Sequence, residues 1–402
     1  MPDLDTAAWY ALGVPAYLLY IGAEVFIAWR RREREKVFGF AETLSNLTAG
    51  FGTLVIGLFV GPFVLRAWDL AHDHLAPVRW PTQGAWRLPA ALILADFCYY
   101  AYHRAGHRFA LFWSIHGIHH QHEYLNSSVG FRLEWLADPY AALFFGLMPL
   151  AGIDSTTGFA ALMILSIYAL TAHTTVLGRP SFGFLVTPAI HGAHHSRDAR
   201  FADKNFGAML GIWDRLFGTW LEPRAGERLC ADVPSIARTH DGVRTQWGLV
   251  RELAREVASA GGLRAKLRVL LSPPVVAGPP APLREDAEIA WKARIYVLVQ
   301  FAGMALLGTW LLLAPVARPL HVQVAAAVTV LVGLSALGGL LDGRSGALRF
   351  ERARLVALAA AGGALATHER VYLALIALAA FGLVHSLSLE TAEARSAGPA
   401  GT

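Results

Sequence analysis

Histidines gather in one part of this chain at spacings typical of metal ligands. Ten of the 16 histidines lie between His103 and His195, in less than a quarter of the sequence. Nine of them form three clusters and one isolated position, namely His103 and His107, then His116, His119 and His120, then His173, and finally His191, His194 and His195. Residues i, i+3 and i+4 of a helix project from one face, so we expect each cluster to direct its imidazoles at a common point.

The number of imidazoles predicts two metal ions, because eight or nine neutral ligands exceed what one ion can bind. All-nitrogen ligation suits iron, zinc, copper or nickel better than magnesium or calcium, so the ligands alone leave the metal open. A single histidine near a helix end is more often an ordinary interfacial residue, but three clusters of repeated spacing favour ligation. His122 lies two residues past the second cluster and off its helical face, so its role as a ligand stays open. The remaining six are expected to lie outside the site: His72, His74, His240, His321, His368 and His385.

The elements that position these histidines must be membrane helices. Of the 402 residues, 55% are hydrophobic and only 16% are charged, whereas soluble proteins carry roughly 25% charge. This composition excludes an ordinary cytosolic enzyme and a disordered chain, and the widely separated Cys98 and Cys230 are expected to be free thiols rather than a disulfide scaffold. The net charge of +5 is modest, and we expect no nucleic-acid partner. Arginine supplies almost all of the basic residues, which hints at a GC-rich bacterial source.

Nine apolar segments approach the roughly 20 residues that a helix needs to cross a bilayer. They are Trp9–Trp29, Leu44–Leu65, Leu88–Tyr102, Pro139–Ile153, Ser155–Leu177, Ile295–Ala317, Leu320–Leu341, Leu355–Thr367 and Val371–Leu389. The fourth and fifth segments, separated by Gly152 and Asp154, are expected to form a helical hairpin. The N-terminus has neither a basic region nor a small-residue cleavage site, so we expect the first segment to be retained.

Basic clusters set the expected orientation, because short loops rich in Arg and Lys stay in the cytoplasm. One cluster follows the first segment and another lies between the seventh and eighth: Arg30, Arg31, Arg32, Arg34 and Lys36, and Arg344, Arg349, Arg352 and Arg354. Both place the histidine clusters at the cytoplasmic ends of helices. The sequence therefore predicts an all-α, polytopic integral membrane protein of a bacterial inner membrane, with a cytoplasm-facing, histidine-rich di-metal site.

Four regions follow from this pattern. Residues 1–87 form an N-terminal helix pair, 88–225 the histidine-rich domain, 226–288 a cytoplasmic segment with a Pro/Gly-rich linker at Ser272–Pro282, and 289–392 a C-terminal helical domain. A metal transporter is the alternative of a different class, but it would place its ligands near the middle of several spans, whereas here the histidines gather at one membrane face. A zinc protease is excluded because His122-Glu123 is followed by Asn at position 126, where H-E-x-x-H requires histidine.

The order H-R-x-x-H, H-x-x-H-H, H-x-x-H-H resembles the histidine boxes of the fatty acid hydroxylase and sterol desaturase superfamily. The flanking sequences resemble it too: Asp96-Phe97 with Tyr99-Tyr100, Asn126 and Arg132, residues 203–207 and residues 213–219. The helices beyond the third box look like the alkylglycerol monooxygenase subgroup and its bacterial members, as do the stretches 238–240, 291–296 and 340–344 with Gln246 and Gln300. The chain departs from the family at Asp198, where Asn is frequent, and at His122, where a small polar residue is common.

The resemblance implies a non-haem di-iron oxidoreductase that uses O2 to oxidise a lipid in the bilayer, with the nine clustered histidines as iron ligands. The subgroup implies hydroxylation beside the ether oxygen of an alkylglycerol, which releases a fatty aldehyde. A fatty acid, sterol or carotenoid hydroxylase or desaturase of the same superfamily is the alternative. Because the sequence has no Rossmann fingerprint, cytochrome motif or cysteine cluster, we expect an external electron donor, and the subgroup suggests tetrahydrobiopterin.

Two polar residues are candidates for orienting the ligand histidines through hydrogen bonds. Asp96 lies in an apolar segment about two helical turns before His103, where an intramembrane acid suggests a functional partner. Asn126, which follows the second box, is the other candidate, and Glu24 in the first segment is a weaker case. The aromatic run from Phe97 to Tyr102 either lines a lipid path or forms an interfacial belt.

Overall fold

The fold is entirely helical in the part of the chain that the computed structural model describes. That part comprises residues 6–33, 37–81, 83–176, 183–224, 227, 229, 239–274, 289–313, 318–365 and 377–386. One isolated antiparallel bridge, between Leu185 and Leu210, is the only β pairing among these residues. The all-α prediction is therefore confirmed. Cys230, His368 and most of the predicted linker at Ser272–Pro282 lie outside the described residues.

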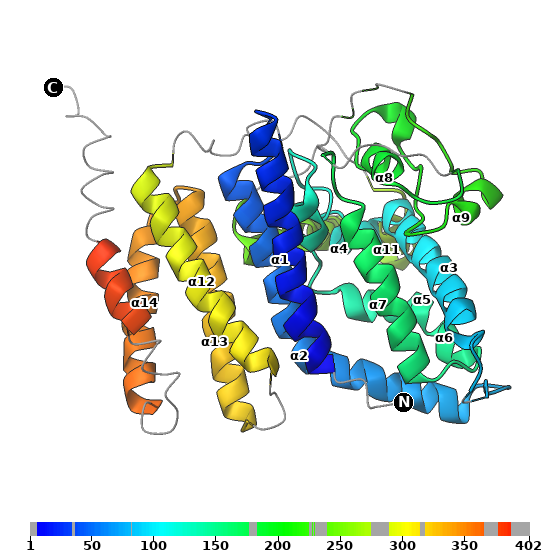
Figure 1. The fold of residues 1–402 in the computed structure, drawn as a ribbon, viewed down its shortest axis with the longest axis horizontal. Coiled ribbons are helices and arrows are strands. Elements are labelled where there is room, and N and C mark those ends of the chain that lie inside the picture. The colour runs from blue at the N-terminus through cyan, green and yellow to red at the C-terminus, as the bar shows by residue number, and fades with distance from the viewer. Residues whose placement is uncertain are drawn as a thin grey trace.

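The helices form two bundles joined by a central pair (Figure 1). The central pair is α1 (Thr6–Arg30) and α2 (Phe40–His74). One side holds α3 (Arg87–Arg108), α4 (Ala110–His116), α5 (Ala137–Phe145), α6 (Leu147–Leu150), α7 (Ser155–Thr171), α8 (Pro188–His194) and α9 (Ile212–Leu216), with short 3-10 turns η2 (Ser127–Phe131) and η3 (Ala199–Phe201). The other side holds α12 (Trp291–Leu313), α13 (Leu320–Leu341) and α14 (Ala347–Leu365), and α10 (Gly242–Ser259) and α11 (Gly262–Leu271) precede it in the chain.

Helix α2 contributes to the apolar cores of both bundles. Phe51 and Val55, in its first half, belong to the core formed with α12, α13 and α14. Trp68, near its end, belongs to the core formed with α3 and α7, and its indole nitrogen donates a hydrogen bond to the Ile153 carbonyl. A Cβ at Gly158 would come within 2.2 Å of the Trp68 ring, so α7 approaches α2 closely only because that residue is glycine. The long helix thus fixes the two bundles to one another.

Three helices among the described residues are long and apolar enough to cross a membrane: α2, α12 and α13. Helix α7 is apolar but has only 17 residues. The predicted span at Pro139–Ile153 is wrong as a single helix, because the chain there is divided into α5, of nine residues, and α6, of four. Gly146 ends α5 and Pro149 lies in α6, and both residue types disfavour a continuous helix. Helix α3 runs through Arg108, six residues past the predicted end, and so carries the first two clustered histidines itself.

Candidate metal centre

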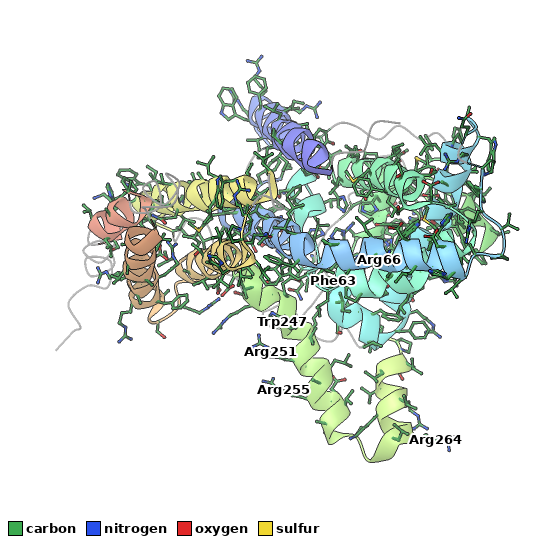
Figure 2. The ribbon with its side chains drawn as sticks, turned by 90° about the horizontal axis from the view of Figure 1, so that it is seen from below. Phe63, Arg66, Trp247, Arg251, Arg255 and Arg264 are labelled. Atoms are coloured by element: carbon green, nitrogen blue, oxygen red, sulfur yellow. The ribbon has the colours of Figure 1, made fainter. Side chains whose placement is uncertain are left out.

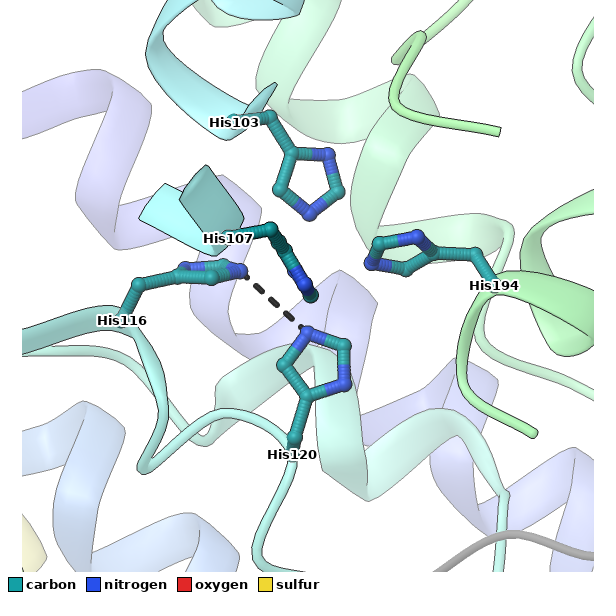
Figure 3. A group of neighbouring side chains, drawn as sticks. All are labelled: His103, His107, His116, His120 and His194. Carbon is teal, nitrogen blue, oxygen red and sulfur yellow. Dashed lines mark hydrogen bonds between the residues drawn. The ribbon is translucent and has the colours of Figure 1, made fainter. Parts of the chain in front are cut away.

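The nine clustered histidines lie in two groups, within each of which the candidate ligand nitrogens are within 4.8 Å of one another. The first group is His103, His107, His116, His120 and His194, and the second is His119, His173, His191 and His195. Figure 3 shows the five imidazoles of the first group around a common space. Eight of the nine residues are buried and His107 is partly buried. The fold therefore brings together all nine residues to which the spacing pointed.

The second histidine cluster contributes to both groups. Helix α4 ends at His116, and the following residues form turns in which the His119 amide donates to the His116 carbonyl and the His120 amide donates to the Gly117 carbonyl. His116 and His120 join the first group while His119 joins the second. The expectation that each cluster points at one place is wrong here, because the side chains of adjacent residues in a helical turn diverge by about 100°. Neighbouring imidazoles therefore reach different centres.

The third cluster is divided in the same way. His191 and His194 lie on α8, which begins with Pro188 in its first turn, and His195 follows at the C-terminal end. His194 belongs to the first group, whereas His191 and His195 belong to the second. Only the first cluster, on the regular helix α3, directs both of its residues at one group. The two centres therefore share two short segments, and neither can be built from one cluster alone.

Backbone carbonyls fix the orientation of four imidazoles. The Nδ1 atoms of these rings lie close to carbonyl oxygens, at 2.8 Å for His103 and Phe206, 3.3 Å for His119 and Arg132, 2.9 Å for His173 and Ala169, and 2.9 Å for His194 and Lys204. A carbonyl oxygen only accepts, so Nδ1 carries the proton in each ring and Nε2 presents a lone pair in the neutral form. This is the arrangement by which a protein prepares Nε2 as a metal ligand.

The Nε2 atoms of the second group lie too close together for an empty site. The Nε2 atom of His173 is 3.0 Å from that of His119 and 2.9 Å from that of His191, which is itself 3.1 Å from Nε2 of His195. With both Nδ1 atoms of His119 and His173 protonated, two lone pairs face one another. A cation between them removes this repulsion, since nitrogens about 2.1 Å from a metal are about 3 Å apart at a right angle.

The first group has unpartnered nitrogens instead. The Nε2 atoms of His103, His107 and His194 are buried without a hydrogen-bond partner, and that of His120 is 3.3 Å from Nε2 of His116. Buried polar atoms without partners are costly in a folded protein, so several of them aimed at one place indicate a ligand there. The residues of both groups therefore fit bound metal ions.

Burial keeps four of the clustered histidines, His120, His173, His194 and His195, in the neutral form at physiological pH. Burial is the main cause and lowers the pKa of His173 to about 4 and that of His194 to about 3, although backbone hydrogen bonds partly oppose it. Burial also lowers the pKa of His120 and His195 well below its ordinary value, with a smaller contribution from neighbouring histidines. A neutral imidazole is the form that binds a metal, so no deprotonation cost opposes binding at pH 7.

Glu134 contacts the first group directly, although the spacing of the histidines does not reveal it. Its carboxylate lies 2.8 Å from Nδ1 of His116, and both side chains are nearly inaccessible to solvent. A carboxylate behind a ligand histidine fixes its tautomer and makes it a stronger ligand. Gln246 on α10 holds this segment by accepting from the Trp135 amide at 2.9 Å and donating to the Leu133 carbonyl at 3.1 Å. In the sequence the acid that stands alone in an apolar segment is Asp96, whereas Glu134 has Arg132 and Asp138 nearby and does not stand out.

His122 lies outside both groups but contacts one of them. Its Nε2 is 2.9 Å from Nδ1 of His195, and its side chain is buried. If Nε2 of His195 binds a metal, its Nδ1 carries the proton and donates it to His122. The structure therefore places His122 behind His195, a member of the second group, and not within either group. Glu134 stands in the same relation to His116.

The expectation for Asp96 requires correction. Its carboxylate accepts hydrogen bonds from the Met209 amide at 2.9 Å and from the Trp213 indole at 2.9 Å, and among the described residues it makes no hydrogen bond to a histidine. The reason is distance along the helix, because seven residues of α3 separate Asp96 from His103 by about 10 Å. Asp96 instead anchors the segment whose Phe206 carbonyl orients His103. Asp214 supports the same segment by accepting from the Phe206 and Gly207 amides, both at 2.8 Å.

Asn126 also has a different role from the one expected. Its side chain accepts from the Ser128 amide at 2.9 Å and so begins η2, and it donates to the Val37 carbonyl at 2.7 Å. A local cap of this kind uses the side chain before it can reach a histidine. Glu24 does lie close to the site, because its carboxylate accepts from the Ser127 amide at 2.7 Å and from Thr174, which follows His173.

The histidines expected to be unrelated to the site lie outside both groups wherever the structure describes them. His240 is buried, but its Nδ1 is 3.0 Å from Asp342 near the end of α13. His72 and His74 end α2, and His321 and His385 lie in the C-terminal bundle. The clustering in sequence therefore separated the gathered histidines from these.

Similarity to known proteins agrees with the geometry. Residues 88–219 match the fatty acid hydroxylase family model, so the predicted family resemblance is confirmed. The chain is 26% identical to alkylglycerol monooxygenase of Danio rerio over 360 residues, which cover 85% of this chain and 79% of that protein. It is 26% identical to the Homo sapiens alkylglycerol monooxygenase over 65% of this chain and 62% of that protein. It is 28% identical to an ornithine lipid hydroxylase of Rhizobium tropici over 48% of this chain and 60% of that protein. No solved structure matches the chain significantly.

Proposed function

We propose that this membrane lipid oxidoreductase, which carries a fatty acid hydroxylase family domain, is a di-iron monooxygenase that cleaves alkylglycerol ether lipids. The observation that supports a bound metal is the contact between the Nε2 atoms of His119 and His173, which are 3.0 Å apart with their lone pairs facing one another. Neutral nitrogen ligands suit iron, although the ligands alone do not select it. We further propose that the protein lies in a bacterial inner membrane with the histidines on the cytoplasmic side, where the Arg30 and Arg344 clusters also lie.

Two iron ions bound at these groups would supply reductive activation of O2 for insertion of one oxygen atom into a C–H bond. The proposed reaction takes place at the carbon beside the ether oxygen and gives a hemiacetal, which separates into a fatty aldehyde and glycerol. One oxygen atom enters the lipid and the other leaves as water, so two electrons and two protons are required. We propose an external donor for them, with tetrahydrobiopterin as the first candidate.

Aromatic side chains of α3 lie beside histidines of the first group. The ring centroid of Tyr99 is 5.4 Å from that of His103, and the centroid of Tyr102 is 6.3 Å from that of His116. The Tyr140 hydroxyl donates to the Tyr102 carbonyl, which joins α5 to α3 beside the first group. These aromatic rings of α3 give an apolar boundary to the site, and exclusion of water protects an oxidising centre from side reactions.

Ether cleavage is favoured over other lipid oxidations by the extent of similarity. The match to the Danio rerio alkylglycerol monooxygenase covers 85% of the chain, far more than the 132 residues of the family domain. The match to the ornithine lipid hydroxylase covers 48%. Hydroxylation of a lipid that stays intact is the second candidate, because this relative and the family model both carry that activity in their names.

A lipid assay with labelled O2 separates these candidates. The protein is purified in nanodiscs, its iron is measured, and alkylglycerol is supplied with a reduced pterin. About two iron ions per chain and pterin-dependent release of fatty aldehyde support the proposal. Labelled oxygen retained in an intact lipid supports the hydroxylase instead. The metal is assigned to the two groups if His119→Ala and His194→Ala lose both iron and activity while the control His321→Ala keeps them. Only trace iron in the unmodified protein overturns the proposal.

A further inference from the structure

Helices α10 and α11 form a hairpin that projects from the helical body (Figure 2). Gly262, at the turn between them, has φ of +79°, a backbone conformation that glycine adopts without strain. The hairpin lies between the histidine-rich bundle and the C-terminal bundle in the sequence, and the functions assigned so far use only Gln246 from it. Its outer surface therefore needs a separate explanation.

Helix α10 has one face against the protein and another away from it. Gln246, Leu249 and Leu253 are buried, and a Cβ on Gly117 would meet the Leu249 side chain at 2.8 Å. Trp247 and Arg251 are exposed and lie one turn apart, with Arg255 a further turn along. Figure 2 shows these three residues along the outer side of the hairpin. A tryptophan beside a row of arginines is the composition of a helix at a membrane surface.

Helix α11 has no buried residue at all, although six of its ten residues are apolar. Leu263, Leu267 and Leu271 are spaced four apart on one face, and their exposed fractions are 73%, 46% and 56%. Arg264 and Arg268 are exposed beside this leucine row, and the helix contains no acidic residue. An apolar face of this kind requires an apolar medium, and its basic flank requires an anionic one. The interfacial region of a bilayer provides both.

Both ends of the hairpin are attached near the histidine layer. At the start, Asp241 caps α10, and its other carboxylate oxygen is 3.0 Å from Arg344, in the basic cluster that follows α13. At the end, the Ser272 carbonyl accepts from the Ala110 amide at 2.8 Å, where α4 begins. Helix α4 carries His116. The hairpin therefore lies at the end of the bundles where the histidines and the basic loops are found, which is the level of a membrane surface.

We propose that the α10–α11 hairpin lies in the surface of the bilayer beside the metal centre and binds anionic phospholipids. The leucine row of α11 and Trp247 enter the boundary between headgroups and acyl chains. The hairpin arginines Arg251, Arg255, Arg264 and Arg268 contact lipid phosphates, to which guanidinium groups bind in a bidentate manner. This inference requires a membrane protein but does not depend on the proposed lipid oxidation. Binding of the hairpin to the bilayer and oxidation of a lipid can therefore be tested separately.

Depth measurement by spin labelling tests the leucine row in the full-length protein. A nitroxide is placed by Leu267→Cys in a Cys230→Ser background, since Cys98 is buried, and the protein is reconstituted in nanodiscs. The matched control is Glu256→Cys, which is exposed on the same hairpin. The label at 267 is expected to collide with O2 at least about five times more readily, relative to a water-soluble nickel complex, than the label at 256. The proposal is overturned if the nickel complex reaches the labels at 267 and 256 equally. It is also overturned if the label at 267 is shielded from both O2 and nickel, as it would be beneath a protein partner.

Lipid retention tests the arginines. The variant Arg251→Gln/Arg255→Gln/Arg264→Gln is compared with Arg66→Gln, which alters an exposed arginine in the second half of α2 (Figure 2). In nanodiscs with about 30% phosphatidylglycerol, we expect the triple variant to lose at least about half of the anionic lipid retained through purification, as seen by native mass spectrometry. The Arg66 variant should retain the unmodified amount. Equal retention in all three proteins overturns the assignment of anionic lipid.

Discussion

The two ends of the molecule both bury polar side chains, but they satisfy them differently. In the C-terminal bundle, Glu351 accepts from the Tyr296 hydroxyl at 2.5 Å and from Arg354 at 2.6 and 2.7 Å, and Arg354 also donates to Gln300 at 2.8 Å. Donors meet acceptors there and tie α12 to α14, and only Nη1 of Arg354 is left without a partner in this cluster. In the histidine layer, acceptors face acceptors. His119 and His173 are the clearest case, because carbonyls hold the protons of both rings on the far side.

This difference separates a structural cluster from a binding site. Burial alone marks both regions, and a buried acid such as Glu351 would qualify as functional by burial and type. Complementarity is the better criterion, because a cluster that pairs its own donors and acceptors needs no ligand. A cluster whose like atoms converge is stable only when something else binds between them.

Removal of a second-group histidine should have the largest effect. We expect His173→Ala to lower the monooxygenase activity by at least about 1,000-fold, equivalent to about 4 kcal/mol, because one metal loses a ligand. The unfolding midpoint of the metal-free protein should stay level or rise, since the facing lone pairs are relieved. Iron content, turnover and thermal unfolding of metal-free protein are measured together. A lower midpoint in the metal-free variant would mean that the histidines pair with one another as Glu351 and Arg354 do.

The opposite result is expected in the C-terminal bundle. Glu351→Ala leaves Arg354 buried without its partner, and breaking a buried ion pair costs about 3 kcal/mol or more. The iron content per folded chain should not change, because α14 carries no clustered histidine. Stability is measured by unfolding of the reconstituted protein, and iron content per folded chain is measured by metal analysis. Arg244→Ala, at an exposed arginine of α10, serves as the control for a surface substitution. Loss of iron without loss of stability would place a metal function in this bundle.

The helical class and the membership of the histidine layer could be predicted from sequence, and the assignment to two centres could not. Composition requires membrane helices, and the repeated spacing selects the nine histidines. Spacing describes faces of regular helices, however, whereas His119 and His120 lie in turns after α4. Adjacent residues then point to different centres, and only the tertiary arrangement shows which.

Hydrogen-bond partners were still harder to predict. Asp96 and Glu134 are both buried acids, and the local sequence does not show which of them contacts a histidine. Their roles depend on which segment folds against each: residues 209–213 against Asp96, and His116 against Glu134. The division of Pro139–Ile153 into two helices has a local cause. Gly146 and Pro149 interrupt the helix, although the apolar composition of the segment predicts one continuous span.

Glu134 allows a finer test of the histidine layer. Glu134→Gln keeps the size of the side chain but removes the charge behind His116, so we expect the affinity of the first group for metal to fall by about 10–100-fold. The second group should retain its metal. Titration of metal-free protein with Fe(II) or Co(II), followed spectroscopically, resolves the two sites if they differ. Equal weakening of both sites would mean that the centres are not separable. Glu123→Gln serves as the control. Glu123 is an acid near the second cluster, and its backbone amide donates a hydrogen bond to Glu42.

His122 should give the smallest effect, because its contact with His195 is a single hydrogen bond between two imidazole rings. A neutral hydrogen bond contributes about 0.5–1.5 kcal/mol, so His122→Ala is expected to weaken metal binding in the second group by roughly 3–10-fold. The first group, whose carboxylate is Glu134, should be unaffected. Because His122 is buried, loss of its ring also leaves space, and His122→Asn retains a polar side chain for comparison. Rescue of affinity in the Asn variant attributes the effect to the hydrogen bond, whereas equal loss in both attributes it to packing. An effect on the first group instead of the second would contradict the division of the nine histidines into two centres.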